Sequence, residues 1–194
     1  FLIFHCILFY FILLASQNWC TMKSLNSLVL KDLPYLNGTL PACLGNISRL
    51  GSITIEQTGL QGEIPWSRWM PLFKDQGSIL NSLGLRFSLE GNLGLYGRAL
   101  PEEFPLGCLI QNFRISQQPR LSGDLPSTVS KCRMKTLYIT DVSLTGELPL
   151  EICEICTLEY LIISGTNLSI ESIDAFNSSC TITQHIDLCI SKGK

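Results

Sequence analysis

The chain has 194 residues, 46% of them hydrophobic and only 15% charged, and its formal net charge at pH 7 is -2. A chain with this much apolar surface and so few charges is not expected to be disordered. Because no stretch interleaves Lys or Arg with aromatic residues, we also expect no nucleic-acid partner.

The first fifteen residues are apolar apart from His5, and a polar run follows from Ser16. They fall short of the roughly 20 residues that a membrane-spanning helix requires, and small residues end the run as at a signal-peptidase site. We interpret residues 1–16 as a signal-peptide-like segment and residues 17–194 as the folded domain. A signal anchor and a buried core helix remain the alternatives. Because no Met opens the run, we expect the chain to begin inside a longer reading frame.

Four Asn-x-Ser/Thr sequons permit N-glycosylation in the secretory route. Their asparagines are Asn37, Asn46, Asn167 and Asn177. Together with the apolar leader they favour a protein that is secreted or lies on the extracellular face of the plasma membrane. Any attachment to the membrane is expected only through a missing or upstream segment.

A Gly-x-Leu/Ile-Pro motif recurs along the chain and ends at Pro41, Pro65, Pro126 and Pro149, with a longer variant at Pro101. The intervals of 24, 36, 25 and 23 residues indicate a 24-residue repeat with one insertion. We place the insertion at about residues 66–80 and expect about six repeats.

Each repeat carries an L-x-L pair that alternates between apolar and polar positions, as a short strand does. A single coil of this size cannot close a core, so each coil must stack on the next. We expect one inward side chain of each strand to line up across the coils. The row consists of Leu28, Ile53, Phe113, Leu137 and Leu161.

A second ladder, of cysteines, recurs at 24-residue intervals as Cys108, Cys132, Cys156 and Cys180. Disulfides and packed thiols both fit this spacing, and we favour packed thiols because Cys is often fully buried. The single C-x-x-C at Cys153 is too little for zinc, so we expect no metal. A capping disulfide between Cys180 and Cys189, and a place for Cys20 in an amino-terminal cap, are further hypotheses.

The consensus LxxLxLxx(N/T)xLxGx(I/L)Pxxhxxh resembles the plant-specific class of leucine-rich repeats. The stretch Leu36–Pro41 followed by Leu44–Ser48 is similar to ectodomains of plant receptor-like kinases and receptor-like proteins, and to polygalacturonase-inhibiting proteins. The resemblance covers about residues 22–190. It implies an α/β-type solenoid, a superhelix with short parallel strands on the concave face and mostly 3₁₀ or irregular segments behind them.

The sequence departs from this family where an Asn ladder is expected. The equivalent positions hold Leu33, Thr58, Asn92, Gln118, Val142 and Thr166, so only Asn92 matches. Leu33 and Val142 cannot donate, so we expect the carbonyls at those bends to find other partners. The segment 186–190 looks like a seventh strand cut short, and we expect the domain to be truncated at its C-terminus.

The resemblance implies that ligands bind to the side chains between the strand leucines. We expect Arg114, Tyr138 and Tyr160 to form one stripe, because Tyr and Arg carry much interface energy. The full candidate set is Arg86, Glu90, Arg114, Tyr138, Thr140, Tyr160 and Ile162. The simpler alternative is that these side chains only cover the strands. Trp66 and Trp69 in the insertion form either a docking loop or, as we favour, packing at the edge of a coil.

No catalytic constellation is recognisable, so we expect neither an enzyme nor a cofactor. The first hypothesis is an extracellular recognition domain of a receptor-like kinase or receptor-like protein in signalling or defence. Its expected partners are a protein, peptide or glycan ligand and a co-receptor. The alternative is a secreted inhibitor of a cell-wall-degrading glycosidase, similar to polygalacturonase inhibitors, and a third is a remnant without a stable fold.

Overall fold

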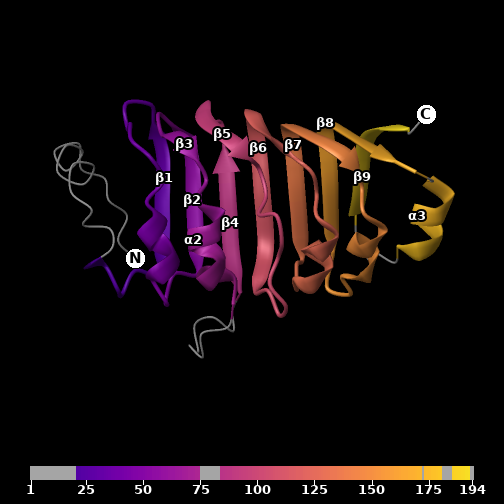
Figure 1. Ribbon diagram of the computed structural model, residues 1–194, viewed down its shortest axis with the longest axis horizontal. Helices are drawn as coiled ribbons and strands as arrows, with labels where there is room; N and C mark the ends of the chain where they lie inside the picture. The colour runs from indigo at the N-terminus through magenta and orange to yellow at the C-terminus, as the bar shows by residue number, and fades with distance from the viewer. Residues whose placement is uncertain (1–20, 75–83, 172, 181–184, 193–194) are drawn as a thin grey trace.

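The computed structural model describes residues 21–74, 84–171, 173–180 and 185–192 (Figure 1). The expected signal-peptide-like segment, Cys20 and most of the second half of the expected insertion lie outside the described residues. Over the described residues the chain winds into successive coils, and each coil adds one strand to a parallel sheet (Figure 1).

The main sheet follows the order of the chain, β1-β2-β4-β6-β7-β8-β9, and each neighbouring pair is parallel. Every link between neighbours is therefore a crossover that returns behind the sheet. The strands are β1 (Ser27–Leu33), β2 (Ser52–Thr58), β4 (Leu85–Glu90), β6 (Ile110–Gly123), β7 (Thr136–Glu147), β8 (Tyr160–Ile170) and β9 (His185–Lys192). We call the side of these strands that faces away from the crossovers the concave face.

The predicted inward row is confirmed by the register of the sheet. Leu28 pairs with Ile53, and Phe113, Leu137 and Leu161 follow in the same row, with Phe87 of β4 between Ile53 and Phe113. The side chains of this row are at most 9% exposed from Leu28 to Leu161. Burial of each large apolar side chain contributes about 1.5–3 kcal/mol, so the stacked row stabilises the coils jointly.

A second, lateral set of parallel pairings follows a bend in each coil. β3 (Gln61–Glu63) pairs with β5 (Gly94–Arg98), β5 pairs with the end of β6, and the ends of β6, β7 and β8 continue the row. At the bend, one residue per coil has a left-handed backbone. These residues are Asp32, Gln57, Gly91, Gln117, Asp141 and Gly165. The repeated positive φ turns each coil from the concave face to the lateral row in the same way.

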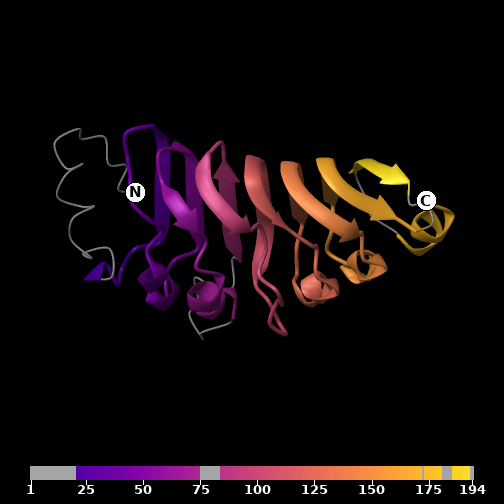
Figure 2. The same cartoon turned by 45° about the horizontal axis from the view of Figure 1, so that its top comes forward.

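Short helical segments cover the other side of the sheet (Figure 2). They are η3 (Ala42–Asn46), α2 (Trp66–Trp69), η4 (Met70–Phe73), η6 (Ser127–Lys131), η7 (Leu150–Glu154) and α3 (Ile173–Ser179). Four of these are 3₁₀ helices, so the back of the molecule is built as predicted. A parallel sheet backed by short 3₁₀ turns confirms the predicted solenoid fold class.

The two tryptophans at the start of the insertion are buried rather than displayed. Trp66 is 7% exposed and Trp69 is fully buried, and Trp66 lies 5.3 Å from the ring of Phe87. Their indole N–H groups donate to the carbonyls of Arg98 and Pro41, both at 3.0 Å. The docking-loop interpretation is therefore wrong, because both rings and both polar tips are already used inside the coil stack.

The cysteines depart from the prediction of packed free thiols. Cys108 and Cys132 form a disulfide between neighbouring coils, with Cα atoms 4.3 Å apart, because the parallel register brings residues one repeat apart side by side. Cys153 forms a disulfide with Cys180, which contradicts the hypothesis of a bond between Cys180 and Cys189. Cys43 is also disulfide-bonded. Cys156 is a free thiol, and it is exposed rather than in the core.

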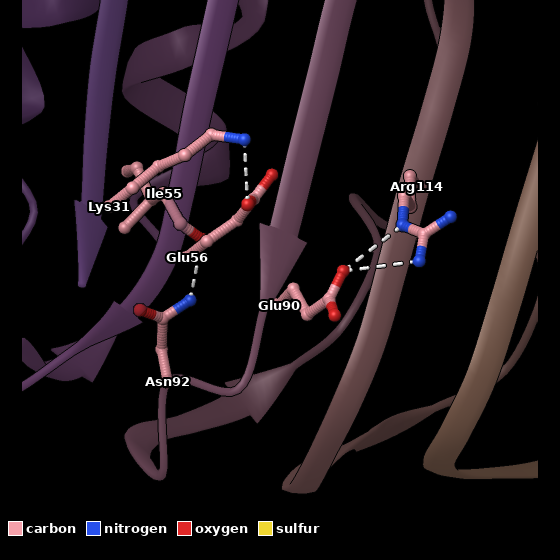
Figure 3. Close-up of polar contacts among 6 residues, drawn as sticks. All are labelled: Lys31, Ile55, Glu56, Glu90, Asn92 and Arg114. Atoms are coloured by element: carbon pink, nitrogen blue, oxygen red, sulfur yellow. Dashed lines mark hydrogen bonds and ion pairs between the residues drawn. The ribbon is translucent and has the colours of Figure 1, made fainter.

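The expected Asn ladder becomes a polar ladder of more than one residue, although the sequence indicated only Asn92. The side-chain amide of Asn92 donates to the carbonyl of Ile55 at 2.8 Å (Figure 3). Its oxygen accepts from the backbone N–H and the hydroxyl of Thr58. The side-chain amide of Gln118 is oriented so that its nitrogen faces an acceptor and its oxygen faces donors. In this orientation the nitrogen donates to the backbone carbonyl of Asn92 at 2.8 Å. The ladder stops where Val142 pairs with Gln118.

Replacement of Asn92 by Ala should lower the free energy of unfolding by about 3 kcal/mol or more. The change leaves the Thr58 N–H and the Ile55 carbonyl buried without this partner, at about 1–3 kcal/mol each. The measurement is urea unfolding followed by tryptophan fluorescence. Asn112→Ala is the control, because half-buried Asn112 makes one side-chain bond to Thr136. Equal midpoints for the two variants would contradict the ladder.

Replacement of Gly45 by Ala should destabilise the first coils. A Cβ at Gly45 would collide with the backbone carbonyl of Arg68, where η3 and α2 touch. Overpacking of this kind costs about 1–3 kcal/mol. Thermal unfolding by circular dichroism measures the loss, and Gly51→Ala is the matched control because its Cβ would meet nothing nearer than 3.9 Å. A melting temperature of Gly45→Ala equal to that of Gly51→Ala would disprove the close contact.

Candidate functional site

The outward side chains of the concave face form rows across the strands, because the register is nearly constant from β1 to β9. The middle row contains Val29, Thr54, Ser88, Arg114, Tyr138, Ile162 and Asp187. A flanking row contains Ser27, Ser52, Arg86, Asn112, Thr136, Tyr160 and His185, with a register shift between β4 and β6 before Arg86. Five of the candidate residues thus lie on two adjoining rows, and Glu90 and Thr140 lie on a third row on the other side of the middle row.

Arg114 is the centre of this surface. Its Nε and Nη2 donate to one carboxylate oxygen of Glu90 at 3.3 and 3.1 Å (Figure 3). On the other side, its guanidinium carbon lies 4.0 Å from the centre of the Tyr138 ring. An Arg held between a carboxylate and an aromatic ring loses little further freedom when a ligand binds.

The predicted stripe is only partly correct. Arg114 does pair with Tyr138, but the next residue in their row is Ile162, whereas Tyr160 pairs with Thr136 in the flanking row. The reason is spacing, since Tyr138 and Tyr160 are 22 residues apart and not one repeat of 24. Tyr160 therefore lies diagonally beside Tyr138.

The other candidate residues differ in how accessible they are. Arg86 is exposed, and it forms no ion pair with another described residue. Ile162 is half-buried next to Tyr138, and Tyr160 is 39% exposed. Thr140 is only 8% exposed, so it offers a ligand little surface. Arg86, Arg114, Tyr138, Tyr160 and Ile162 remain as the accessible part of the candidate site.

The predicted set of site residues omits an ion pair on the same face, between Lys31 and Glu56. The lysine amine lies 2.8 Å from a carboxylate oxygen of Glu56 (Figure 3). Opposite charges one repeat apart on adjoining strands are the sequence signal that finds such pairs. Beside the pair of Glu90 and Arg114, it forms a second ion pair on the concave face between β1 and β6, where Arg86 adds a positive charge without a partner among the described residues.

The sequons lie away from the outward rows of the concave face. Asn37 and Asn46 are exposed, the first after β1 and the second at the end of η3. Asn167 is exposed on the lateral part of β8, where it pairs with Thr145, and Asn177 lies in α3. Glycans at these positions would leave the rows around Arg114 uncovered.

The described residues contain no cluster of three or more His, Cys, Asp or Glu side chains that could hold a metal ion. Among the same residues, no helix has the length and apolar character needed to cross a membrane. The outward side chains of the concave face carry guanidinium groups, carboxylates, aromatic rings and hydroxyls.

Repeating coils of this length, a parallel sheet, 3₁₀ crossovers and the Gly-x-Leu-Pro motif define the class of the chain as a leucine-rich-repeat solenoid. It resembles the ectodomains of plant leucine-rich-repeat receptors. The chain matches no protein-family model, and a comparison with curated proteins finds no similar sequence.

Among solved structures, it is similar to the BIR2 ectodomain from Arabidopsis thaliana, with 20% identity over 73% of this chain and 55% of that chain, and a TM-score of 0.41. It is also similar to the plant peptide hormone receptor RGFR1 in complex with RGF2, with 18% identity over 89% of this chain and 34% of that chain, and a TM-score of 0.43. The chain thus spans less than two thirds of the length of each. These likenesses concern the fold and assign no ligand to this chain.

A double-mutant cycle should show that Glu90 and Arg114 are coupled. We expect Glu90→Gln, Arg114→Met and the double variant to give a coupling free energy of about 0.2–1 kcal/mol, because both side chains are partly exposed. The measurement is urea unfolding at low salt. In molar salt, where charges are screened beyond about 3 Å, the coupling should fall. Additive effects at low salt would show that the pair contributes nothing.

Proposed function

We propose that this protein is an extracellular recognition domain and that its concave face binds a peptide or protein ligand. The observation that carries the proposal is the arrangement around Arg114, which Glu90 and Tyr138 hold in place on a rigid sheet. Partly exposed Arg and Tyr side chains on a preorganised surface are the residue types that dominate binding energy in interfaces.

Two further features support an extracellular ligand-binding role. Disulfides such as Cys108–Cys132 form and persist in oxidising compartments, as in the secretory route. The sequons all lie away from the outward rows of the concave strands, so glycosylation would shield other parts of the surface and leave this one open to a ligand. The rows that surround Arg114 also contain hydroxyls and Asn112, which can bond to a peptide backbone.

The setting that we propose is receptor-like kinase or receptor-like protein signalling, including defence, with a co-receptor as a second partner. The repeat pattern and the solenoid support this setting. A glycan ligand is also compatible with the outward rows around Arg114, but their side chains give it less specific support than they give a peptide. The alternative is a secreted inhibitor that occludes a cell-wall-degrading glycosidase. That function would also use the concave face, so only an assay separates the two.

The test begins with selection of random displayed peptides on the immobilised full chain. Calorimetry then measures the affinity of the selected consensus peptide for Arg114→Ala and Tyr138→Ala. Each variant should bind at least about tenfold more weakly, which corresponds to about 1.4 kcal/mol. Arg133→Ala and Tyr35→Ala are matched controls, because both residues are exposed and lie outside the outward rows. Unchanged affinity in the first pair would refute the site.

Inhibition of fungal polygalacturonases provides the discriminating assay. If micromolar protein leaves pectin hydrolysis unchanged, the inhibitor alternative fails and the recognition proposal stands. If hydrolysis falls and Arg114→Ala restores it, the inhibitor function replaces receptor signalling as the role of the same face.

A further inference from the structure

The turn after β1 contains the single Asn-Gly pair of the sequence, at Asn37 and Gly38. Both residues are exposed, and they lie between Leu36 and Leu40, which are each 5% exposed. Within the described part of the chain, no hydrogen bond engages the Asn37 side chain or the Gly38 N–H. An asparagine side chain and the backbone nitrogen that follows it are thus both available for reaction.

The fold requires glycine at the second position of this pair. Gly38 has a φ of 113°, in the region that side chains other than glycine rarely adopt. The glycines at the same place in other coils also have positive φ, and they are Gly62, Gly97, Gly123 and Gly146. The residues that precede them are Gln61, Tyr96, Ser122 and Thr145. Among these coils, only the one that follows β1 has asparagine before the glycine.

We propose that Asn37 is a self-modification site, at which the backbone nitrogen of Gly38 displaces the side-chain amide in chains that carry no glycan there. The Gly38 N–H gives its proton to water or hydroxide, and the nitrogen attacks Cγ of Asn37. The Cγ–Nδ2 bond breaks, the nitrogen takes a proton from water and leaves as ammonia, and an imide ring remains. Water then opens the ring to aspartate or isoaspartate. The net reaction consumes water and releases ammonia, so it needs no oxidant or reductant.

The reaction should be selective for Asn37. Covalent geometry brings the attacking nitrogen within reach of Cγ, and the absence of a Cβ on Gly38 leaves that nitrogen uncrowded. Asn26 is also exposed, but Ser27 follows it and begins β1. Asn92 is fully buried, and its amide is held by the polar ladder. The chain therefore contains its own internal controls.

The two products differ in their effect on the first coil. Opening of the ring at Cγ leaves a normal backbone and adds one negative charge. Opening at the main-chain carbonyl gives isoaspartate, whose backbone runs through Cβ and Cγ and is longer by a methylene group. The Gly38 carbonyl accepts from the Gln61 N–H at 2.8 Å, and Thr39 pairs with Gln61. Because Leu36 and Leu40 are held in the core, the added length should displace Gly38 and loosen this pairing.

Asn37 is also the asparagine of a sequon completed by Thr39, so two modifications compete for one nitrogen. A glycan on Nδ2 is bonded to the atom that must leave, and its bulk shields Cγ. Loss of the amide, in turn, removes the atom to which a glycan is attached. Each chain should therefore follow only one of the two courses.

Mass spectrometry of the aged full chain tests the reaction. Protein produced in bacteria without N-glycosylation is incubated at mildly alkaline pH, and its peptides are compared over days. Asn37 should lose its amide several-fold faster than Asn26, with aspartate and isoaspartate both appearing at residue 37. Asn37→Gln should keep its amide, because its ring would be larger. Equal loss at Asn37 and Asn26 would overturn the proposal, as would aspartate without isoaspartate, since direct hydrolysis gives aspartate alone.

Hydrogen exchange tests the structural consequence. Chains with isoaspartate at residue 37, separated by chromatography, should exchange the Gln61 amide faster than Asn37→Asp, which has the same charge and a normal backbone. Equal exchange rates would show that the added methylene group leaves the pairing of Thr39 with Gln61 intact.

Thr39→Val tests the competition with glycosylation, because valine keeps the β-branched shape and removes the hydroxyl that the sequon requires. Both proteins are produced in a eukaryotic secretory host and aged in the same way. The wild type should keep the Asn37 amide, whereas Thr39→Val should lose it as fast as the bacterial protein. Equal loss in the two proteins would contradict protection by a glycan.

Discussion

Parallel hydrogen bonding between coils in nearly constant register is the constraint on which the rest of the structure depends. Because each strand pairs with the strand one repeat earlier, every position of a coil joins a row that crosses the sheet. Inward rows, such as the one from Leu28 to Leu161, become continuous apolar layers. Outward rows become continuous surfaces. The same register thus supplies both the stability of the core and the alignment of side chains that a ligand would meet.

Local departures from the repeat are absorbed by specific packing. The coil that follows Pro65 is longer than the others, and Trp66 and Trp69 fill the space behind it against Phe87. The polar ladder is strongest at the same place, where Asn92 bonds to Thr58 and meets Gln118. Disulfides join coils further along, at Cys108–Cys132 and Cys153–Cys180. Aromatic packing, amide bonds and disulfides therefore reinforce successive sections of one stack.

The concave face combines order with accessibility. Arg114 gains its orientation from two neighbours on different strands, so its position is a property of the sheet and not of its own flexible side chain. Arg86 and Tyr160, in the flanking row, have no comparable support in the described residues and are more exposed. A ligand that binds here would contact the fixed side chain of Arg114 and the more adaptable side chains of Arg86 and Tyr160. The fixed group lowers the entropy lost on binding, and the adaptable groups let the surface fit ligands of different shape.

The sequence by itself determined the repeat length and the inward row, because these follow from period-two alternation and from punctuation that a linear pattern records. The 3₁₀ crossovers were implied by the resemblance of the repeat to plant leucine-rich repeats. Tertiary structure decided what depends on distances between coils. Whether Cys108 and Cys132 bond, whether Trp69 faces a partner or the core, and which row holds Tyr160 are all set by how coils of unequal length come into register. Spacing along one chain shows which residues belong to a coil, but hydrogen bonding between strands fixes which of them become neighbours.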